Sequence, residues 1–384
     1  MLRKYTLQMP KLICSGENSL ERIPELVAAA EMVAVLTDPG VAGAGLLKLP
    51  LAQLQAAGKR VIVIDDLAAE PTYTQVQSVA DRFRQSGADY IIAVGGGSVM
   101  DAAKLTSILA SGRYRVQDLL DNPAVARKSV PTLMIPTTAG TGSEATPNAI
   151  VVVPEKELKV GIVSGEMVAD YVILDERMTS KLPGKIAAST GADALCHAIE
   201  CWTSRKANPF SDMFALEALD LILNNILQAC DGSDDTTARR NMQLASFYAG
   251  VAITASGTTA VHALSYPLGG KYHIPHGVSN AILLVPVMDF NEPACRERLA
   301  QAYERCCHGA DKARTTQEKS VLLLHRIKEI IKKLDIPTSM RELGVPREDL
   351  DGLVAAGMEV TRLLENNMRT VTPEDAKQIY MQVM

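Results

Sequence analysis

Four polar side chains in the second half of the sequence have residue types that bind metal ions. Asp193 and His197 are four residues apart in Gly-Ala-Asp-Ala-Leu-Cys-His-Ala-Ile-Glu, so on a helix they share one face, one turn apart. His262 and His276 follow, and the chain has only six histidines. One carboxylate with three imidazoles suits Fe²⁺ or Zn²⁺. Spacing alone supports only the Asp193–His197 pair, because a single histidine in a helix is more often a hydrogen-bonded core residue. Cys201, one further turn along, is a weaker candidate ligand.

A glycine-rich turn in the first half is typical of an anion-binding site. The apolar run from Tyr90 enters three glycines, Gly95 to Gly97, and an amphipathic helix begins at once. Glycines let the backbone approach an anion, and the start of a helix supplies free N–H groups. The arrangement suits a diphosphate. It is not the GxGxxG fingerprint, and a tight turn without any ligand has the same pattern.

A second loop, at residues 135–144, packs hydroxyls and glycines between two strands as Ile-Pro-Thr-Thr-Ala-Gly-Thr-Gly-Ser-Glu. By itself such a cluster is usually a solvated loop. Two loops of this kind, each following a strand, fit a ligand crevice at the carboxyl ends of parallel strands. Asp38 also follows a strand, at 33–37. A carboxylate there can bind the ribose of NAD and repel the extra phosphate of NADP, although a turn residue before Pro39 has the same pattern.

The elements that carry these residues change character along the chain. We expect strands and helices to alternate in the first half, which predicts a mostly parallel sheet covered by helices. From about Pro183 the β-branched runs disappear, and we expect only helices. We therefore predict an α/β dinucleotide-binding domain at 1–182 and an all-helical metal-binding domain at 183–384. Strands are expected at 32–37, 60–64, 90–94, 133–135 and 149–153, and the main helices at 74–85, 99–107, 185–202, 211–230, 237–255, 292–307, 316–334 and 347–364.

Composition excludes several classes of protein. The chain has 384 residues, 47% of them hydrophobic and 22% charged, and a net charge of -5, with no basic cluster for nucleic acid. The N-terminus lacks the apolar core of a signal peptide. Residues 241–270 carry no charge but are rich in Gly, Ser and Thr, so we predict a buried segment rather than a membrane span. The odd number of cysteines, seven, with no CxxC pair, favours reduced thiols in the cytoplasm.

Taken together, the motifs resemble one known family. GGGSxxDxxK, PTTAGTGSE, GxDALxHAIE and the segment from His262 to Pro275-His276-Gly277 are similar to those of the iron-containing (group III) alcohol dehydrogenases. The resemblance runs from Pro10 to the C-terminal helix. It implies the dehydroquinate synthase-like fold, with a cleft between an α/β NAD-binding domain and a helical domain. It also implies that the enzyme transfers a hydride between NAD and a small alcohol, diol or aldehyde, with a metal ion polarising the substrate oxygen.

The resemblance carries functional residues onto this chain. It implies that Fe²⁺, or Zn²⁺ in its place, is bound by Asp193, His197, His262 and His276. It implies that NAD is contacted by Asp38, Gly96, Gly97, Ser98, Thr137, Thr138 and Thr141, with further contacts at Lys159, Thr179 and Leu182. It also implies a homodimer or larger homo-oligomer, and the N-terminal segment from Tyr5 to Cys14 is a candidate strand for pairing between subunits.

The chain departs from the family pattern at two positions. Some members have a proton-relaying histidine four residues after the third ligand, where this chain has Tyr266. The proton route then falls to Tyr266, to His273 or to solvent, so we assign catalytic roles to His262, His276, Tyr266 and His273. Glu70 stands where some members have an asparagine near the adenine, which weakens one cofactor contact.

Two alternatives stay open at this level. Glycerol dehydrogenases and dehydroquinate synthases resemble the same architecture and bind Zn²⁺, but a phosphate-rich substrate needs several basic residues, and only Lys271 accompanies the ligand motifs. The chain is alternatively a catalytically silent member of the fold that binds metal or nucleotide. Turnover of a simple alcohol with NAD separates these readings.

Overall fold

The structure is a computed structural model that describes residues 4–156, 158–231, 236–308 and 315–384. The chain forms two compact units. The α/β unit comprises Gln8–Thr138 and Gly142–Leu182, and the helical unit comprises Pro183–Met384, Ala139–Thr141 and the described part of Met1–Leu7. The short insertion Ala139–Thr141, from the second glycine-rich loop, therefore groups with the helices rather than with the strands that flank it.

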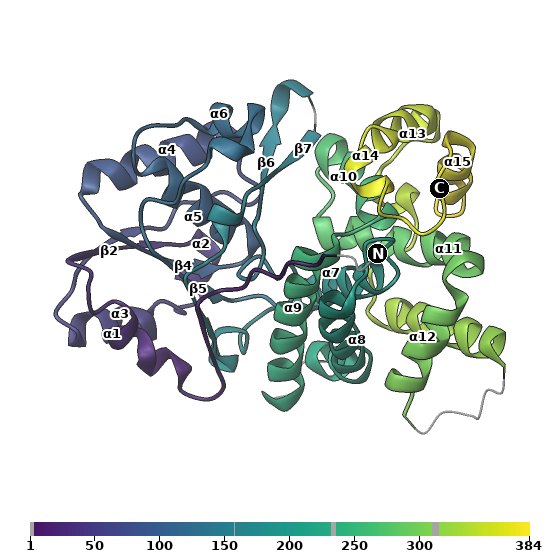
Figure 1. The fold of residues 1–384 in the computed structure, drawn as a ribbon, viewed down its shortest axis with the longest axis horizontal. Coiled ribbons are helices and arrows are strands. Elements are labelled where there is room, and N and C mark those ends of the chain that lie inside the picture. Colours follow the sequence, from purple (N-terminus) through teal and green to yellow (C-terminus); the bar gives the residue numbers. More distant parts are fainter. Residues whose placement is uncertain (1–3, 157, 232–235, 309–314) are drawn as a thin grey trace. The chain divides into compact units, whose positions relative to one another are not determined.

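The α/β unit is built on one parallel sheet with the strand order β1-β8-β5-β4-β2-β3 (Figure 1). Its central strand β4 is buried along its whole length, as expected for a parallel sheet covered on both faces. The strands are β1 Leu12–Ser15, β2 Met32–Leu36, β3 Arg60–Ile64, β4 Tyr90–Gly95, β5 Thr132–Pro136 and β8 Tyr171–Leu174. The predicted mostly parallel sheet is confirmed. Strand β8 was not expected from the sequence, while β1 overlaps the end of the candidate strand Tyr5–Cys14 and pairs with β8 of the same chain.

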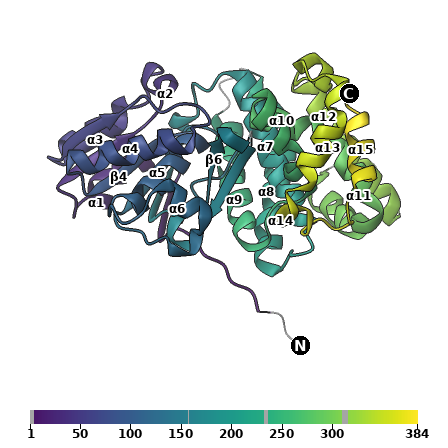
Figure 2. The ribbon, with the colours of Figure 1, turned by 90° about the horizontal axis from the view of Figure 1, so that it is seen from above.

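Helices lie on both faces of this sheet. Figures 1 and 2 show α4, α5 and α6 on one face, while α1 and α3 lie on the other. The longest of them, α4, starts at a capping box in which Thr72 and Gln75 satisfy each other's backbone N–H groups. The helices are α1 Ile23–Leu26, α2 Pro39–Gly43, α3 Lys48–Ala56, α4 Tyr73–Ser86, α5 Gly97–Leu109 and α6 Val116–Asp121.

The strand expected at 149–153 forms but does not join the parallel sheet. It is β6, Asn148–Val153, and it pairs antiparallel with β7, Leu158–Val163, in a separate two-stranded sheet. The side chains of β6 alternate between half-buried and buried, which is typical of a strand with one covered face. This alternation distinguishes β6 from the fully buried β4 and β5.

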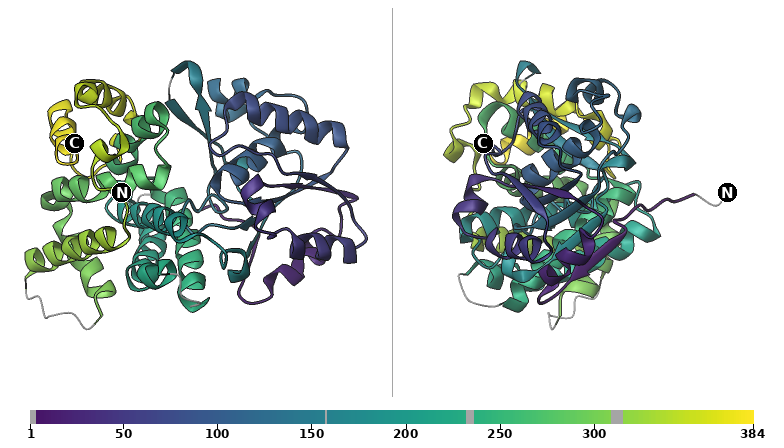
Figure 3. Two further views of the ribbon diagram at one scale, coloured as in Figure 1. Left: turned by 180° about the vertical axis from the view of Figure 1, so that it is seen from behind. Right: turned by 90° about the vertical axis from the view of Figure 1, so that its left-hand side faces the viewer.

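The helical unit contains no strand among its described residues, in agreement with the predicted fold class. Figure 3 shows its helices from two further directions, with α13 and α15 of the C-terminal part coloured yellow. Its helices are α7 Gly184–Trp202, α8 Pro209–Cys230, α9 Thr236–Ser256, α10 Ala260–Tyr272, α11 His276–Cys306, α12 Thr316–Lys333, α13 Leu350–Met358, α14 Thr361–Leu364 and α15 Pro373–Met381.

Two helix predictions were wrong in extent. The helix expected at 292–307 begins sixteen residues earlier, at His276, and is kinked at Cys295, whose φ of -127° is not helical. Pro286 and Pro293 lie inside this helix, and because proline normally ends or kinks a helix, they obscure its true start in the sequence pattern. The single helix expected at 347–364 is divided into α13 and α14, with Val360 outside helical geometry between them.

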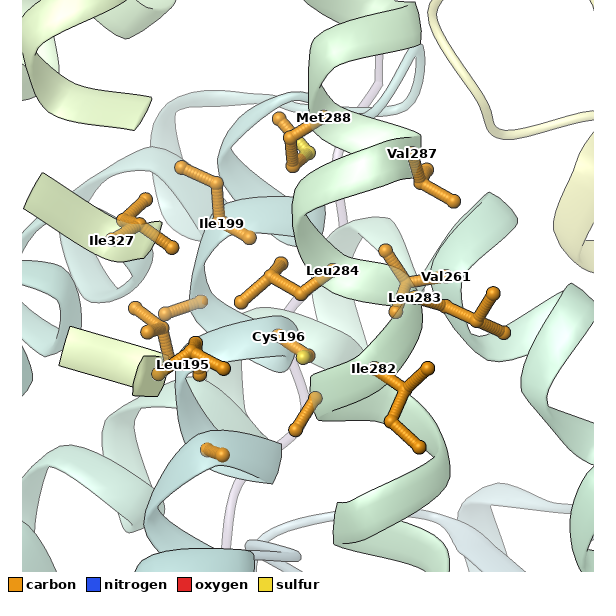
Figure 4. Close-up of a cluster of buried hydrophobic side chains, with 14 of the residues drawn as sticks. Leu195, Cys196, Ile199, Val261, Ile282, Leu283, Leu284, Val287, Met288 and Ile327 are labelled. Carbon is orange, nitrogen blue, oxygen red and sulfur yellow. The ribbon is translucent and has the colours of Figure 1, made fainter. Parts of the chain in front are cut away.

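Helix α7 lies in the centre of the helical unit's core (Figure 4). Leu195, Cys196 and Ile199 project from α7 toward Leu284 and Met288 of α11. Val261 of α10 and Ile327 of α12 belong to the same buried cluster. Since α7, α10 and α11 carry the candidate metal ligands, apolar packing holds those ligands in position.

Helix α8, among the described residues, is long and apolar enough to cross a membrane by length and composition alone. The core helix of a soluble protein meets the same test, and α8 packs on α7 and α9. The uncharged stretch at 241–270 forms parts of α9 and α10, which meet at a bend of 108°.

Candidate metal centre

Helix α7 places Asp193 and His197 on one buried face, as their spacing predicts. The Oδ1 atom of Asp193 lies 3.8 Å from Nε2 of His197, and their side chains are 3% and 7% exposed. The segment continues as a helix through Trp202, so the two side chains are held one turn apart on a rigid element.

The beginnings of two further helices supply the other histidines. His262 lies in the first turn of α10, and His276 is the first residue of α11, directly after Pro275. The Nε2 atoms of both lie 3.6 Å from Oδ1 of Asp193. The structure therefore brings together all four candidate ligands named from the sequence, and they come from the three helices α7, α10 and α11.

The geometry fits one divalent cation. One ligand atom from each of Asp193, His197, His262 and His276 lies within 4.8 Å of the other three. Bonds of about 2.1 Å to a tetrahedral ion would separate ligand atoms by about 3.4 Å, close to the distances between Asp193 and the histidines. The side chain of His276 is 31% exposed while the other three are nearly closed off, so the open side of the cluster is beside His276.

Asn280 provides an independent test of this fit. It lies one turn after His276 on α11, and its Nδ2 atom is 2.7 Å from Asp193 Oδ1, 3.1 Å from His262 Nε2 and 3.2 Å from His276 Nε2. Its Oδ1 atom is buried without a hydrogen-bond partner. One NH₂ group, with two N–H donors, thus faces three converging ligand atoms, an arrangement that a bound cation would satisfy.

The second nitrogen of two of these histidines has its own partner. Nδ1 of His197 lies 3.3 Å from the carbonyl oxygen of Gly140, and Nδ1 of His262 is bonded to the Glu200 carboxylate. A proton on Nδ1 leaves the Nε2 lone pair for a metal ion. Both rings, which stack at 4.5 Å, are thus oriented as metal ligands.

Glycines allow the backbone to approach α7 closely at two points. A Cβ on Gly140 would lie 2.6 Å from the Cβ of Thr190, and one on Gly277 would lie 2.1 Å from the carbonyl oxygen of Ser189. Any side chain at either position would displace the chain from α7. Gly277 therefore lets His276 reach the cluster, and Gly140 lets its carbonyl reach His197.

Charges in the cluster shift the pKa values of its members. Burial opposes the ionisation of Asp193, but the neighbouring histidines outweigh it and hold the pKa of this carboxyl well below its usual range. Burial is the main effect on His197 and lowers its pKa. Burial also opposes the charge on His262, but the Glu200 and Asp193 carboxylates prevail and raise its pKa to about 9. Since only a neutral imidazole binds a metal ion, metal binding must displace the proton that this raised pKa keeps on His262 near neutral pH.

Reasoning from the sequence missed Gly140, Glu200 and Asn280 as neighbours of the ligands. For Glu200 a signal was present, because it lies seven residues after Asp193 and three after His197 and so shares their helical face. Asn280 is likewise four residues after His276. No local signal links Gly140 to His197. Cys201 is outside the ligand group, and its thiol lies 3.7 Å from the carbonyl oxygen of Gly257.

The two candidates for proton relay lie in different environments. The ring of Tyr266 is half-buried and its centroid is 6.1 Å from that of His276. His273 is exposed and ends α10 in the left-handed conformation, with φ of 55°. Tyr266 is thus the one that adjoins the cluster on its open side.

The expected cofactor residues of the α/β unit gather at neighbouring strand ends. Asp38 follows β2, Gly96 follows β4 and Thr137 follows β5, and these strands are adjacent in the order β5-β4-β2. The chain leaves β2 for β3 on one side and β4 for β5 on the other, so Asp38 and Gly96 flank the point where the strand order reverses. Ligands of open α/β sheets bind at such a point.

Local contacts shape this edge. Gly96 caps α5, which starts at Gly97, and a Cβ on Gly96 would contact the side chain of Thr138 at 3.4 Å. The N–H of Thr137 donates to the carbonyl of Gly95 at 3.0 Å. Ser98 accepts from the N–H of Glu70 at 3.1 Å.

The other expected cofactor residues are more scattered. Lys159, on β7, is buried, and its Nζ lies 2.6 Å from Oε1 of Glu70. The backbone N–H of Glu70 in turn donates to Ser98, so Glu70 links Lys159 to Ser98. Thr141 is half-buried in the insertion that groups with the helical unit. Thr179 and Leu182 share one turn after β8, where the N–H of Leu182 donates to the carbonyl of Thr179 at 3.1 Å. The described contacts of these two residues are local.

Comparison with known proteins places the chain in a family. The sequence profile of the iron-containing alcohol dehydrogenases matches residues 10–176, and that of the C-terminal part of the Fe-containing alcohol dehydrogenase family matches residues 187–384. Long-chain-alcohol dehydrogenase 1 of Geobacillus thermodenitrificans is 33% identical over 97% of this chain and 94% of its own length.

Solved structures agree with the sequence match. A 1,3-propanediol oxidoreductase superposes with a TM-score of 0.93 at 30% identity, over all of both chains. Sulfoacetaldehyde reductase from Bifidobacterium kashiwanohense, solved with NAD⁺, superposes with a TM-score of 0.88 at 27% identity, over 100% of this chain and 99% of that one. The chain belongs to the iron-containing alcohol dehydrogenase family and is a nicotinamide-linked oxidoreductase of alcohols and aldehydes.

Proposed function

We propose that Asp193, His197, His262 and His276 bind a single Fe²⁺ ion, with Zn²⁺ as the alternative, and that the enzyme uses NAD rather than NADP. The observation that carries the proposal is the convergence of the four ligand atoms on one point, with the Nδ1 atoms of His197 and His262 bonded elsewhere. When bound, the ion supplies Lewis-acid polarisation of a substrate oxygen and the nicotinamide ring exchanges the hydride.

The chain's own residues position and enclose this chemistry. Asp193, His197 and His262 are buried, so they exclude water from three sides, and the exposed side of His276 gives the substrate access. Low exposure strengthens the electrostatic effect of each ligand on the reacting oxygen. The glycine turn after β4 and the hydroxyls after β5 are proposed to bind the diphosphate and the nicotinamide end of NAD.

Tyr266 is proposed to pass the proton between the substrate oxygen and solvent. Support comes from its position beside His276, the ligand on the open side of the cluster. A phenol both donates and accepts hydrogen bonds, so it can replace an imidazole in a relay. His273 remains a proposed second donor at the exposed end of α10.

The substrate is proposed to be a small alcohol, diol or aldehyde. The relatives act by name on long-chain alcohols, on 1,3-propanediol and on sulfoacetaldehyde, so the fold accepts several side groups. We further propose that the enzyme acts in the cytoplasm as a homo-oligomer. All seven cysteines are free thiols, and β1 is an edge strand of its sheet among the residues that the structure describes.

Metal stripping and reloading test the proposed centre. The protein is stripped with a chelator, reloaded separately with Fe²⁺ and Zn²⁺, and assayed for metal content and for NAD reduction across a panel of alcohols. His262→Ala should lose bound metal and at least about a thousandfold in kcat, because Lewis-acid stabilisation contributes several kcal/mol. His325→Ala, an exposed histidine of α12, is the control and should retain both. Full activity of the stripped protein would refute the proposal.

A further inference from the structure

Glu200 has a fully buried carboxylate that contacts the candidate metal ligand His262. Glu200 does not itself belong to the group of four candidate ligands. It lies on α7, on the helical face of Asp193 and His197, and its exposure is 0%. A buried carboxylate is costly unless its oxygens are fully hydrogen-bonded. The partners of Glu200 therefore indicate what it is for.

The two oxygens of Glu200 have different partners. Oε1 accepts from the N–H groups of Thr259 and Val261, each at 2.9 Å, and from the Thr259 hydroxyl at 2.8 Å. The N–H of His262 is also within reach of Oε1, at 3.4 Å. Oε2 faces Nδ1 of His262. One oxygen thus caps the start of α10, while the other binds a side chain of the same helix.

We propose that Glu200 is a positioning residue that fixes His262 in the Nδ1–H tautomer and so delivers its Nε2 lone pair to the metal ion. The proposal rests on the proposed function, in which His262 is a metal ligand. An ionised carboxylate only accepts hydrogen bonds, so the nitrogen that faces Oε2 must carry the proton. Nε2 is then the nitrogen left for the metal ion, and it is the atom that lies 3.6 Å from Asp193 Oδ1.

The asymmetry of the two oxygens makes Glu200→Gln a decisive substitution. The Oε1 position faces backbone N–H groups and a hydroxyl, so a glutamine must keep its carbonyl oxygen there. Its NH₂ group then occupies the Oε2 position and donates to Nδ1 of His262. The imidazole must carry its proton on Nε2, which directs an N–H instead of a lone pair at the metal. The α10 cap survives, while the tautomer is reversed.

The alternative is that Glu200 only caps α10. A cap requires an oxygen at the helix start, and glutamine keeps one. If that were its whole role, Glu200→Gln would lower the melting temperature slightly and leave the affinity for metal unchanged. Thr259→Val provides the matched control, because it removes one donor to Oε1 and leaves the contact between Oε2 and His262 in place.

The experiment measures Zn²⁺ dissociation constants by chelator competition, with Co²⁺ absorption spectra as a report on the ligand set. We expect Glu200→Gln to bind Zn²⁺ about 10–100-fold more weakly, with an altered Co²⁺ spectrum, while the apo protein still unfolds cooperatively near the native melting temperature because the α10 cap is retained. Thr259→Val should stay within about twofold of the native affinity. Native affinity in Glu200→Gln overturns the proposal.

Two further readouts keep the result unambiguous. Should Glu200→Gln fail to fold, ¹⁵N-histidine NMR of the native Zn²⁺-loaded protein decides, because a proton on Nε2 of His262 overturns the proposal and one on Nδ1 supports it. His262→Ala is measured alongside. If that variant also binds Zn²⁺ with native affinity, the proposed metal centre itself is wrong. If only Glu200→Gln does, the error lies in the role of Glu200.

Discussion

The carbonyl oxygen of Gly140 lies 3.3 Å from Nδ1 of His197, so a loop glycine and a helix histidine from separate sequence motifs meet at one hydrogen bond. The bond can form because Gly140 has no side chain. A Cβ at this position would clash with Thr190 and push the loop away from α7. The loop and the candidate metal ligand are thereby coupled, and a change at Gly140 should reach the metal.

Gly140→Ala should weaken both folding and metal binding. The added Cβ would lie 2.6 Å from Thr190 Cβ and 2.7 Å from its carbonyl oxygen, so the loop must shift and the carbonyl moves away from His197. Overpacking of this kind costs about 1–3 kcal/mol. Thermal melting of the apo protein and Zn²⁺ titration measure the two effects. Gly352→Ala is the control, because a Cβ there meets nothing within 4 Å. Native Zn²⁺ affinity in Gly140→Ala would show that the bond to Gly140 does not orient His197.

Asp38→Ser should shift the enzyme from NAD toward NADP. The Asp38 carboxylate accepts the N–H of Val41 at 3.0 Å as the cap of α2, and a serine hydroxyl can keep that bond while the charge is lost. Repulsion between the carboxylate and a 2′-phosphate amounts to about 1–4 kcal/mol, so kcat/KM with NADP should rise at least about tenfold. Steady-state assays with both cofactors check this. Asp38→Asn, which also loses the charge, should behave alike. An unchanged NADP preference in both variants would place the cofactor's ribose elsewhere.

Glu70→Gln should bind NADH more tightly. Glu70 pairs with Lys159 at 2.6 Å, and the lysine side chain is only 6% exposed, so Glu70 neutralises a buried positive charge close to the glycine turn. Without that carboxylate the lysine is free to attract the diphosphate, and we expect the NADH dissociation constant to fall about threefold to tenfold. Fluorescence titration at low salt measures it.

Two comparisons qualify the Glu70 result. Glu155→Gln removes an exposed charge of the same unit and should leave NADH binding unchanged. Glu70→Gln combined with Lys159→Gln should lose the gain. Weaker NADH binding in Glu70→Gln alone would mean that Glu70 holds Lys159 in its cofactor-binding position rather than neutralising it.

Glu144 should make stability depend on pH. Burial raises its pKa from 4.5 to about 7, and the nearby Lys104 only partly opposes this. A carboxyl with a raised pKa binds its proton more tightly in the folded state. Its contribution to the free energy of unfolding is therefore fully present below pH 4.5 and is lost as pH rises through 7. The change amounts to about 3 kcal/mol. Urea unfolding of the native apo protein and of Glu144→Gln at pH 5 and pH 8 isolates the contribution of Glu144, because the two proteins have all other titratable groups in common. Relative to the native protein, Glu144→Gln should have a higher free energy of unfolding at pH 8 than at pH 5. If the difference between the two proteins is the same at both pH values, the pKa of Glu144 is not raised.

Much of this protein can be predicted from local patterns. The strands from β2 to β5 were predicted nearly in full, because buried β-branched runs and short turns are local features. Helical spacing was enough to pair Asp193 with His197, since a helix repeats every 3.6 residues whatever surrounds it. The glycine turn after β4 was evident because three consecutive glycines are needed only where the backbone must turn or be approached closely.

Tertiary structure decided the rest. Nothing in the spacing of His262 and His276 brings them to Asp193; the packing of α10 and α11 on α7 does, through the apolar core and the close approach at Gly277. The start of α11 was hidden by prolines and small residues, and β6 had the residues of a sheet strand but paired with β7. The asymmetric bonding of Glu200, from which the tautomer of His262 follows, joins residues about sixty positions apart. Such contacts arise from the packing of whole helices, and no short stretch of sequence determines them.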